Sequence, residues 1–334
     1  MNPPESNRAA TLRDVAALVG VSPRTVSRVV NDEGGFSDET RDKVLEAVEQ
    51  LGYRPNVFAR GLITRRSRTV AFVATTLDDP FFPEVAQAVQ RAARAAGLTM
   101  LLAVNEHDPE LEVELLEQME MYAPEGVIVF PAAGDAEHLR PLLDRGVATV
   151  VVDTPLDHDR AALLVSDLVG AGRIAVEHLI GRGCRRPAML TNDQLDVSSD
   201  PRQQGFVAAC RHAGIDEPTV VKAPATTHGG RQGMALALEV VPDLDAIFAY
   251  NDVMAIGAMQ ALTARGIRMP DDVAVIGCDD IALNTMVTPT LSSVRNDRKQ
   301  IGQEAVRLLG ALVDGRRFDE PTVVPVELVS RQSG

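Results

Sequence analysis

Residues 11–31, TLRDVAALVGVSPRTVSRVVN, carry the signals for two short helices separated by a tight turn. Thr11 is suited to cap the first helix, and Asp14, three residues later, completes a capping box. Gly20 ends that helix, because glycine adopts the left-handed backbone conformation at little cost. Ser22 is suited to cap a second helix directly afterwards. The stretch therefore predicts a helix-turn-helix unit.

The second helix of this unit has two chemically different faces. Pro23 fits its first position, where a backbone amide would have no partner within the helix. The side chains expected to face inward are apolar, namely Val26, Val29 and Val30. The side chains expected to face outward are Arg24, Ser27, Arg28 and Asn31. Guanidinium, amide and hydroxyl groups match the hydrogen-bonding groups of guanine, adenine and phosphate, so this helix is predicted to read a DNA groove.

A third helix is predicted between a Ser37 cap and Gly52. Its apolar face is expected to comprise Val44, Leu45, Val48 and Leu51. The three helices can then share one small core. A three-helix module that contacts only other proteins is the alternative, but such a module would not need the polar groups of the second helix on its outer face.

This amino-terminal segment resembles the headpiece of the lactose repressor (LacI/GalR) family of transcriptional regulators. The resemblance rests on DVAALVGVSPRTVSRVVN at 14–31, FSDETRDKVLEAVEQLGYRPN at 36–56 and ARGL at 59–62. It implies DNA contacts from Thr11, Ser22, Pro23, Arg24, Thr25, Ser27, Arg28, Asn31, Tyr53, Asn56, Ala59 and Leu62.

A short helix is predicted over residues 57–63, after Pro55 has forced an extended backbone and Asn56 has provided a cap. The resemblance implies that two such hinge helices, one from each subunit, fold only on DNA and insert Leu62 into the minor groove. Gly61 weakens the helix by about 1 kcal/mol relative to alanine, which makes its folding dependent on those contacts. A plain linker is the alternative.

Charge is divided unevenly along the 334-residue chain, whose formal net charge is −14. Residues 1–69 hold 11 Lys and Arg against 9 Asp and Glu, a net +2, which leaves 22 against 38, a net −16, for the rest. An acidic body repels phosphate and confines DNA contact to the amino-terminal part. The three cysteines have no paired spacing, and the first residues contain neither a signal peptide nor a membrane span, so we expect a cytoplasmic protein.

From Thr69 onward, short apolar runs alternate with helical stretches, which predicts parallel strands covered by helices. The expected strands are Thr69–Thr75, Thr99–Val104, Gly126–Phe130, Ala148–Val152, Pro187–Leu190, Ala246–Ala249 and Val273–Gly277, with the second set of elements beginning near Leu163. The expected helices include Pro83–Ala96, Glu110–Met121 and Arg298–Leu312. The resemblance extends over the whole chain and implies an α/β body of two lobes, each an open parallel sheet, as in periplasmic sugar-binding proteins.

The expected organisation is an all-α headpiece at residues 9–55, a hinge at 56–68 and an effector-binding and dimerisation body at 69–334. Three crossings between lobes would divide the body into lobe one, about 69–165 plus 296–320, and lobe two, about 166–295 plus 321–334. The chain ends at VPVELVSRQSG without the leucine heptads that make the lactose repressor a tetramer. We therefore expect a homodimer.

In such sheets, small molecules bind at the carboxyl ends of the strands. The resemblance implies an effector site built from Asp79, Phe81, Phe82, Asp153, Ser198, Arg202, Asn251, Asp252 and Asp279. Carboxylates and amides can bond neighbouring sugar hydroxyls while an aromatic ring covers the apolar side and an arginine forks onto two oxygens. Asp252 is equally suited to cap the helix that follows it, and Phe81 is also suited to the core.

One segment, GAGRIA at 170–175, fits a dinucleotide-binding fingerprint, which would make the protein a Rossmann-type oxidoreductase. No acidic residue ends a following strand at the required distance, so close helix packing is the preferred interpretation. The six histidines lack metal spacing, and neither a G-x-S-x-G elbow nor a phosphate-binding loop is present. We therefore expect no metal, no cofactor and no enzymatic activity.

These features together predict a sequence-specific DNA-binding transcriptional regulator, a repressor, acting on near-palindromic operator DNA. A small molecule between the lobes, a sugar or sugar derivative, would control its operator affinity. A solute-binding receptor without a transcriptional role is the alternative, but it would need an export signal. Whether the ligand releases or promotes DNA binding stays open.

Overall fold

The computed structural model describes residues 10–54, 67–195 and 200–334. It divides into two compact units, an amino-terminal headpiece that ends at Ser67 and a body that begins at Arg68. The predicted hinge helix at 57–63 lies outside the described residues. The same is true of four predicted contact residues, namely Asn56, Ala59, Leu62 and Ser198.

The headpiece contains three helices, α1 (Leu12–Val19), α2 (Pro23–Val30) and α3 (Asp38–Leu51). The predicted capping box is confirmed: the Thr11 amide donates to Asp14 Oδ2 over 2.7 Å, and the Asp14 amide donates to Thr11 Oγ1 over 3.4 Å. Gly20 ends α1 with a φ of +76°. Local sequence signals therefore set the bounds of the helix-turn-helix unit.

The headpiece core differs from the prediction at one position. Its fully buried members are Val15, Ala16, Val26, Val29, Val44 and Ala47. Leu45, which we placed on the buried face of α3, is 44% exposed, so that prediction was wrong. Leu45 lies about 100° around the helix from Val44, whereas Ala47 lies three residues on and shares the buried face.

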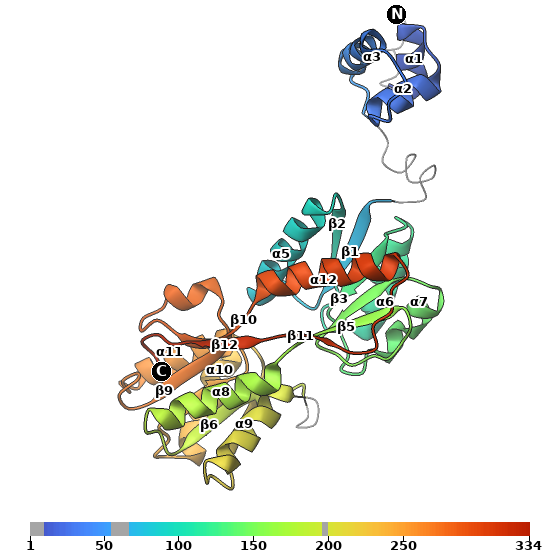
Figure 1. Ribbon diagram of the computed structural model, residues 1–334. Coiled ribbons are helices and arrows are strands. Elements are labelled where there is room, and N and C mark those ends of the chain that lie inside the picture. Colours follow the sequence, from blue (N-terminus) through green and yellow to red (C-terminus); the bar gives the residue numbers. More distant parts are fainter. Residues whose placement is uncertain (1–9, 55–66, 196–199) are drawn as a thin grey trace, which may run out of the picture. The chain divides into compact units, whose positions relative to one another are not determined.

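Lobe one of the body is a six-stranded sheet with the order β11-β5-β4-β3-β1-β2 and parallel pairing throughout. Its strands are β1 (Thr69–Ala74), β2 (Thr99–Val104), β3 (Gly126–Val129), β4 (Thr149–Val152), β5 (Ala161–Ser166) and β11 (Thr322–Val324). One face is covered by α5 (Phe81–Ala95) and α12 (Arg298–Val313), which lie side by side in Figure 1. The other face is covered by α6 (Pro109–Glu120) and α7 (Arg140–Asp144), with the short turn η1 (Glu137–Leu139).

Lobe two is a second six-stranded sheet with the order β12-β10-β9-β8-β6-β7. Its strands are β6 (Pro187–Asn192), β7 (Thr219–Ala223), β8 (Ala246–Ala249), β9 (Ala274–Asp279), β10 (Ser292–Asn296) and β12 (Val326–Val329). Only β12 is antiparallel, against β10. One face is covered by α8 (Leu168–Gly181) and α9 (Pro201–His212), and the other by α10 (Thr227–Val240) and α11 (Asp252–Ala264); η2 (Ala282–Thr285) precedes β10.

The chain crosses between the lobes after β5, after β10 and after β11 (Figure 1). The third crossing lies a few residues later than expected, because β11 pairs with β5 and so belongs to lobe one. The elements near Leu163 likewise belong to lobe one, since β5 pairs with β4. The expected helix at 298–312 does return to lobe one, as α12. The sequences of strands as short as β5 and β11 do not indicate the sheet to which they belong. Their hydrogen-bonded pairing with neighbouring strands determines it.

The GAGRIA segment lies in α8, where its small residues allow close helix packing. A Cβ atom added to Gly172 would lie 2.2 Å from the backbone oxygen of Arg202 in α9. A Cβ atom added to Gly205 in α9 would lie 1.9 Å from the backbone oxygen of Val169. Both glycines are therefore required for α8 and α9 to approach, and this contact sets the position of the first turn of α9.

Candidate DNA-contact surface and effector site

The first turn of α2 is held by its cap. The Thr25 amide donates to Ser22 Oγ over 3.1 Å, and Pro23 occupies the first helical position. Pro23 and Arg24 are exposed, while Val26 and Val29 are buried. The helix therefore presents its amino-terminal side chains outward from a fixed core, the arrangement that suits insertion into a major groove.

Three of the predicted contact residues in and directly after α2 have intramolecular contacts. The Arg28 guanidinium lies against Gly35, where an added Cβ atom would come within 2.0 Å of Nη2. Gly35 has a φ of +79°, which favours glycine there, whereas the Arg28 side chain could move away from an added Cβ atom. Asn31 Nδ2 donates to Ser27 Oγ over 3.3 Å. Of the four outward polar residues, Arg24 is exposed, whereas Ser27, Arg28 and Asn31 are partly buried.

Two further predicted contact residues also stabilise the headpiece: Tyr53 by packing and Thr11 by capping α1. Tyr53 is half-buried and packs against the headpiece core, and burial raises the pKa of its hydroxyl. Thr11 is engaged in the capping box of α1. Both residues shape the headpiece, whatever contacts they make with DNA.

In the body, a hydrogen bond joins the two lobes. Asn251 Nδ2, at the start of α11 in lobe two, donates to Asp79 Oδ2, at the start of α5 in lobe one, over 2.9 Å. Asn251 is also the cap of α11, since its Oδ1 accepts from the Met254 amide over 2.9 Å. Burial raises the pKa of Asp79. The predicted effector residues Asp79 and Asn251 are thus in contact.

Arg202 is the centre of a second group of predicted effector residues. Its side chain is only 11% exposed, and its Nη2 lies 3.8 Å from Asp279 Oδ1. Its Nε donates to Cys278 Sγ over 3.5 Å, and its guanidinium lies 4.5 Å from the centroid of the Tyr250 ring. Burial alone would lower the pKa of Arg202, but Cys278, Tyr250 and the nearby carboxylates raise it well above the ordinary value.

The backbone around Arg202 is fixed by α9 capping. Asp200 accepts from the Arg202 amide over 3.0 Å through Oδ1 and from Thr191 Oγ1 over 2.5 Å through Oδ2. Thr191 lies in β6, so the start of α9 is tied to the carboxyl end of that strand. A buried guanidinium held in this way can fork onto two ligand oxygens with little loss of side-chain freedom.

Asp153 directly follows β4 and Asp279 is the last residue of β9, and both have positive φ angles, +57° and +111°. Asp153 accepts from the Ser166 amide over 2.6 Å and from Ser166 Oγ over 3.3 Å. Burial raises the pKa of Asp153, and it raises the pKa of Asp279 well above the ordinary value. The positive charge of Arg202 acts in the opposite direction and lowers the pKa of both carboxyls.

Two predicted effector residues make structural contacts within the body. Asp252 is buried, and its carboxylate accepts from Ser293 Oγ (2.7 Å), the Asn284 amide group (2.8 Å) and the Ile281 backbone amide (2.9 Å). It therefore fastens the loop around η2 to α11, and the cap itself is Asn251. Phe81 is 6% exposed and lies in the lobe-one core, because α5 begins at Phe81 and not at Pro83.

Phe82, a further predicted effector residue, packs against the lobe-one core. It is partly buried, and its ring meets those of Phe81 and Phe130 edge to face, with centroid separations of 5.3 and 5.4 Å. Tyr250 and Cys278, which contact Arg202, were absent from the predicted set. Their positions at the ends of β8 and β9, immediately before predicted residues, were the available signal.

Among the described residues, no group of three or more His, Cys, Asp and Glu side chains is arranged to hold a metal ion. None of the described helices combines the length and apolar character needed to cross a lipid bilayer.

A helix-turn-helix headpiece and a two-lobed sheet body in one chain define the class of DNA-binding transcriptional regulators. Residues 11–56 match the bacterial regulatory proteins of the lacI family, and residues 176–334 match the periplasmic binding protein-like domain. The chain belongs to the lacI family. It is thus a transcriptional regulator and neither a solute receptor nor an oxidoreductase.

Individual relatives match along the whole chain. The HTH-type transcriptional regulator CelR of Thermobifida fusca is 35% identical over 341 residues, covering 99% of this chain and 100% of that protein. The HTH-type transcriptional regulator DegA of Bacillus subtilis (strain 168) is 32% identical over 330 residues, covering 97% of each. The lac repressor dimer bound to operator and the anti-inducer ONPF has a TM-score of 0.88 at 26% identity, covering 98% of this chain and 99% of that chain.

Proposed function

We propose that the protein is a cytoplasmic repressor that binds near-palindromic operator DNA as a homodimer, with its operator affinity set by a sugar held between the lobes. The proposal keeps the headpiece at 9–55, the hinge at 56–68 and the body at 69–334. The observation that carries it is the pairing of Asn251 with Asp79 across the lobes, beside the buried Arg202. A ligand bound there would touch both lobes at once.

The proposed DNA contacts come from α2 with its two flanking cap residues and from the hinge. Arg24 is exposed and suited to bidentate hydrogen bonds with guanine. Further contacts are assigned to Ser22, Pro23, Thr25, Ser27, Arg28 and Asn31, with Asn56, Ala59 and Leu62 in the hinge. A dimer would place two such helices in half-sites about one helical turn, roughly 34–36 Å, apart.

The charges of the effector site favour an uncharged polyhydroxyl ligand. Asp79, Asp153 and Asp279 contribute three carboxyl groups, whereas the guanidinium at the centre of the group is that of Arg202. A sugar phosphate or sugar acid would add negative charge to buried carboxyls and raise their pKa values further. The related regulator CelR, with a TM-score of 0.72 at 33% identity, has been solved in complex with cellobiose.

In the proposed mechanism, effector binding changes the angle between the lobes. That change shifts lobe one relative to its partner in the dimer and so permits or prevents folding of the hinge helices. Such a coupling is worth roughly 1 to 3 kcal/mol in typical allosteric proteins.

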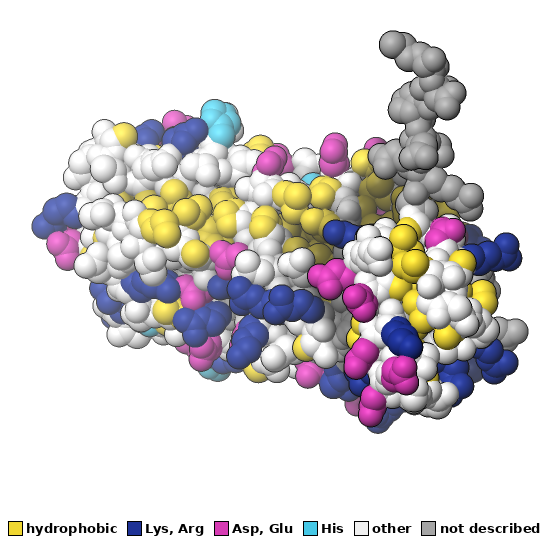
Figure 2. All heavy atoms as spheres, turned by 90° about the horizontal axis from the view of Figure 1, so that it is seen from above, with side chains coloured by type: hydrophobic (Ala, Val, Ile, Leu, Met, Phe, Trp, Pro, Cys, Tyr) yellow, Lys and Arg dark blue, Asp and Glu magenta, His cyan; other side chains and the backbone are white. Residues whose placement is uncertain are grey.

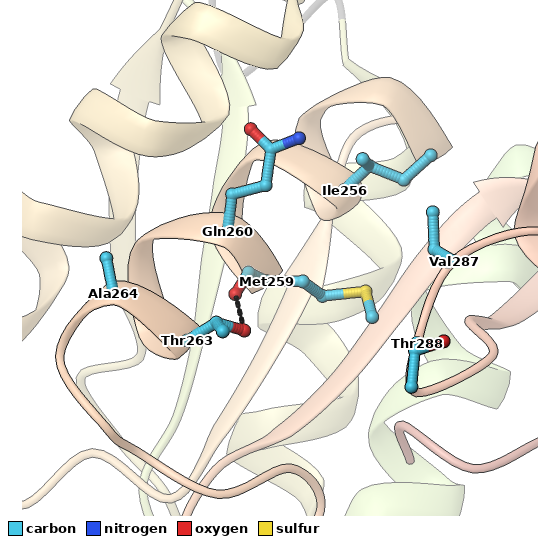
Figure 3. Close-up of a pocket in the computed structure, with 7 residues that line it drawn as sticks. All are labelled: Ile256, Met259, Gln260, Thr263, Ala264, Val287 and Thr288. Atoms are coloured by element: carbon cyan, nitrogen blue, oxygen red, sulfur yellow. Dashed lines mark hydrogen bonds between the residues drawn. The ribbon is translucent and has the colours of Figure 1, made fainter.

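An apolar hollow beside α11 supplies a surface for the proposed dimer. Figure 3 shows Ile256 and Met259 of α11 facing Val287 and Thr288 across this hollow, whose volume is about 410 Å³. Nearby, Met286 is 74% exposed and Leu283 is 41% exposed. In the view of Figure 2, apolar side chains form a band on the body. Apolar surface of this kind is typical of oligomer contacts, and a second copy of the chain is the proposed occupant.

Two measurements test the proposed function. Genomic fragments retained by the purified protein would be sequenced, and we expect enrichment of a near-palindromic site over random competitor. A thermal-shift screen of uncharged mono- and disaccharides, with glucose 6-phosphate and gluconate as charged controls, would then identify the effector, because a ligand of the native state raises the melting temperature. Absence of any enriched fragment, with and without every sugar, would overturn the proposal.

A further inference from the structure

Arg68, the residue at which the body begins, has a left-handed backbone conformation. Its φ is +52°, and the residue is exposed. Residues other than glycine rarely adopt this conformation, because their Cβ atom comes too close to the following carbonyl oxygen. Such a residue keeps a left-handed φ only where the surrounding structure holds it. The neighbours of Arg68 must therefore supply contacts that hold its backbone.

The backbone of Arg68 is hydrogen-bonded toward both strands that flank β1. Its carbonyl accepts from the amide of Thr99, the first residue of β2, over 2.7 Å. Its amide donates to Oε1 of Glu125, the residue directly before β3, over 3.0 Å. In a regular strand the amide and the carbonyl of one residue bond the same neighbouring strand. The positive φ of Arg68 separates the two groups and turns its amide toward Glu125.

The backbone of Glu125 is itself fixed by the sheet. Its amide donates to the Thr69 carbonyl over 2.7 Å, and the next residue, Gly126, pairs in register with Val70. The Glu125 side chain is partly buried and starts from this rigid position. Its carboxylate therefore offers the Arg68 amide an acceptor that is both fixed in place and charged, which strengthens the hydrogen bond.

The φ angle of Arg68 sets the direction in which the preceding residues leave the sheet. Those residues belong to the proposed hinge at 56–68. Without the Glu125 carboxylate, Arg68 would lose the acceptor of its amide and would return to the negative φ that residues other than glycine prefer. The hinge would then leave lobe one in a different direction.

We infer that Glu125 is a positioning residue for operator binding: it holds Arg68 in the left-handed conformation and so fixes the direction in which the hinge leaves lobe one. A fixed direction reduces the conformational freedom that the hinge loses when it binds DNA. The inference rests on the proposed function, because it assumes that the hinge folds on the operator. It does not depend on the effector site, since none of the predicted effector residues takes part.

The test compares the full-length wild type with Glu125→Ala, which removes the acceptor, and with Glu125→Gln, whose Oε1 can still accept. Glu114→Ala is the control, because it removes an exposed carboxylate of α6 from the same lobe. The probes are the enriched genomic fragment and random DNA of equal length at matched salt. We expect Glu125→Ala to bind the fragment about fivefold to tenfold more weakly and random DNA almost unchanged. Glu125→Gln and the control should stay within about twofold of the wild type on both DNAs.

A second substitution separates positioning from a general loss of stability. Asparagine adopts the left-handed conformation more readily than arginine, so Arg68→Asn should keep the backbone conformation without help from Glu125. When both proteins carry Arg68→Asn, we expect Glu125→Ala to weaken binding of the fragment less than about twofold. Comparing proteins that share Arg68→Asn removes the contribution of the arginine charge to DNA affinity.

Unchanged binding of the fragment by Glu125→Ala would overturn the inference and leave the proposed function intact. Equal losses on the fragment and on random DNA, or the same loss with and without Arg68→Asn, would show a general effect of the substitution and would also overturn it. If the wild type itself enriches no fragment, the proposed function fails, and this inference fails with it.

Discussion

Asn251 of lobe two donates a 2.9 Å hydrogen bond to Asp79 of lobe one, although 172 positions separate them in the chain. Each side chain also holds a helix start: Asn251 accepts from the Met254 amide, and Asp79 accepts from the Phe81 amide over 3.0 Å. The amide orientation of Asn251 is thereby set, with Nδ2 directed at Asp79. The link between the lobes is therefore rigidly connected to α5 and α11.

Asp79→Asn should break this link while keeping the start of α5. The new Oδ1 can still accept from the Phe81 amide, but the new Nδ2 would face the Nδ2 of Asn251, and two donors cannot bond. We expect the effector concentration for half-maximal response to change about fivefold to tenfold, measured by titrating the identified sugar into a labelled operator complex. The neighbouring, exposed Asp78→Asn is the control, and identical curves for both variants would contradict the role of Asp79.

Arg202→Ala should abolish the response to effector and leave operator affinity nearly intact. Arg202 contacts Cys278, Tyr250 and Asp279 within lobe two and lies far along the chain from the headpiece. Gel-shift titrations with and without the sugar would measure both properties. Arg173→Ala, which removes an exposed partner of Glu177, is the matched control. A normal response in Arg202→Ala would remove this residue from the site.

Leu62→Ala should weaken specific operator binding far more than nonspecific binding. An inserted leucine unstacks a base step only where the hinge helices fold on the operator, so we expect a loss of about 2 kcal/mol, roughly thirtyfold, for the specific site alone. Salt-matched titrations of operator and random DNA would measure the two losses. Leu45→Ala, an exposed leucine of α3, serves as control. Equal losses on both DNAs would refute insertion.

Val287→Asp should dissociate the proposed dimer. Val287 lines the apolar hollow beside α11, and an unpaired carboxylate buried there by a second copy would cost roughly 3 kcal/mol or more. Sedimentation velocity over a concentration series should show monomers where the wild type is dimeric, with a parallel loss of operator binding. Val240→Asp, at a 59% exposed position on α10, should stay dimeric. A dimeric Val287→Asp protein would place the interface elsewhere.

The stability of the body should fall as the pH rises from about 4 to about 7. Burial raises the pKa of Asp252 to about 7, so the folded state holds a proton that the unfolded chain releases near its ordinary value. The stabilisation linked to this proton is fully present below the unfolded pKa and is lost as the pH rises through the folded one. Burial shifts the pKa values of Asp79, Asp153 and Asp279 in the same direction.

Calorimetric melting across this pH range would measure the effect. Asp252→Asn cannot titrate and should show a shallower slope, and it keeps the contacts, because its Oδ1 can accept from Ile281 and Asn284 while its Nδ2 donates to Ser293 Oγ. A slope identical to that of the wild type would contradict the assignment to Asp252.

Features that depend on local backbone chemistry were predictable from the sequence. The capping box of Thr11 and Asp14, the glycine end of α1 and the start of α12 at Arg298 all lie where the sequence placed them. Each rests on hydrogen bonds or dihedral preferences within a few residues. The pairing of Asp79 with Asn251 was only partly predictable, because family motifs indicated both residues but no local signal states their contact.

By itself, the sequence determined where the headpiece helices begin and end, which strands close with polar side chains, and that the amino-terminal unit presents arginine outward. Only the tertiary structure decided that Phe81 and Asp252 support the core, that Arg28 lies against Gly35, and that β11 belongs to lobe one. The reason is physical: a side chain's burial and partners depend on packing between distant segments, whereas caps and turns are satisfied by their neighbours in the chain.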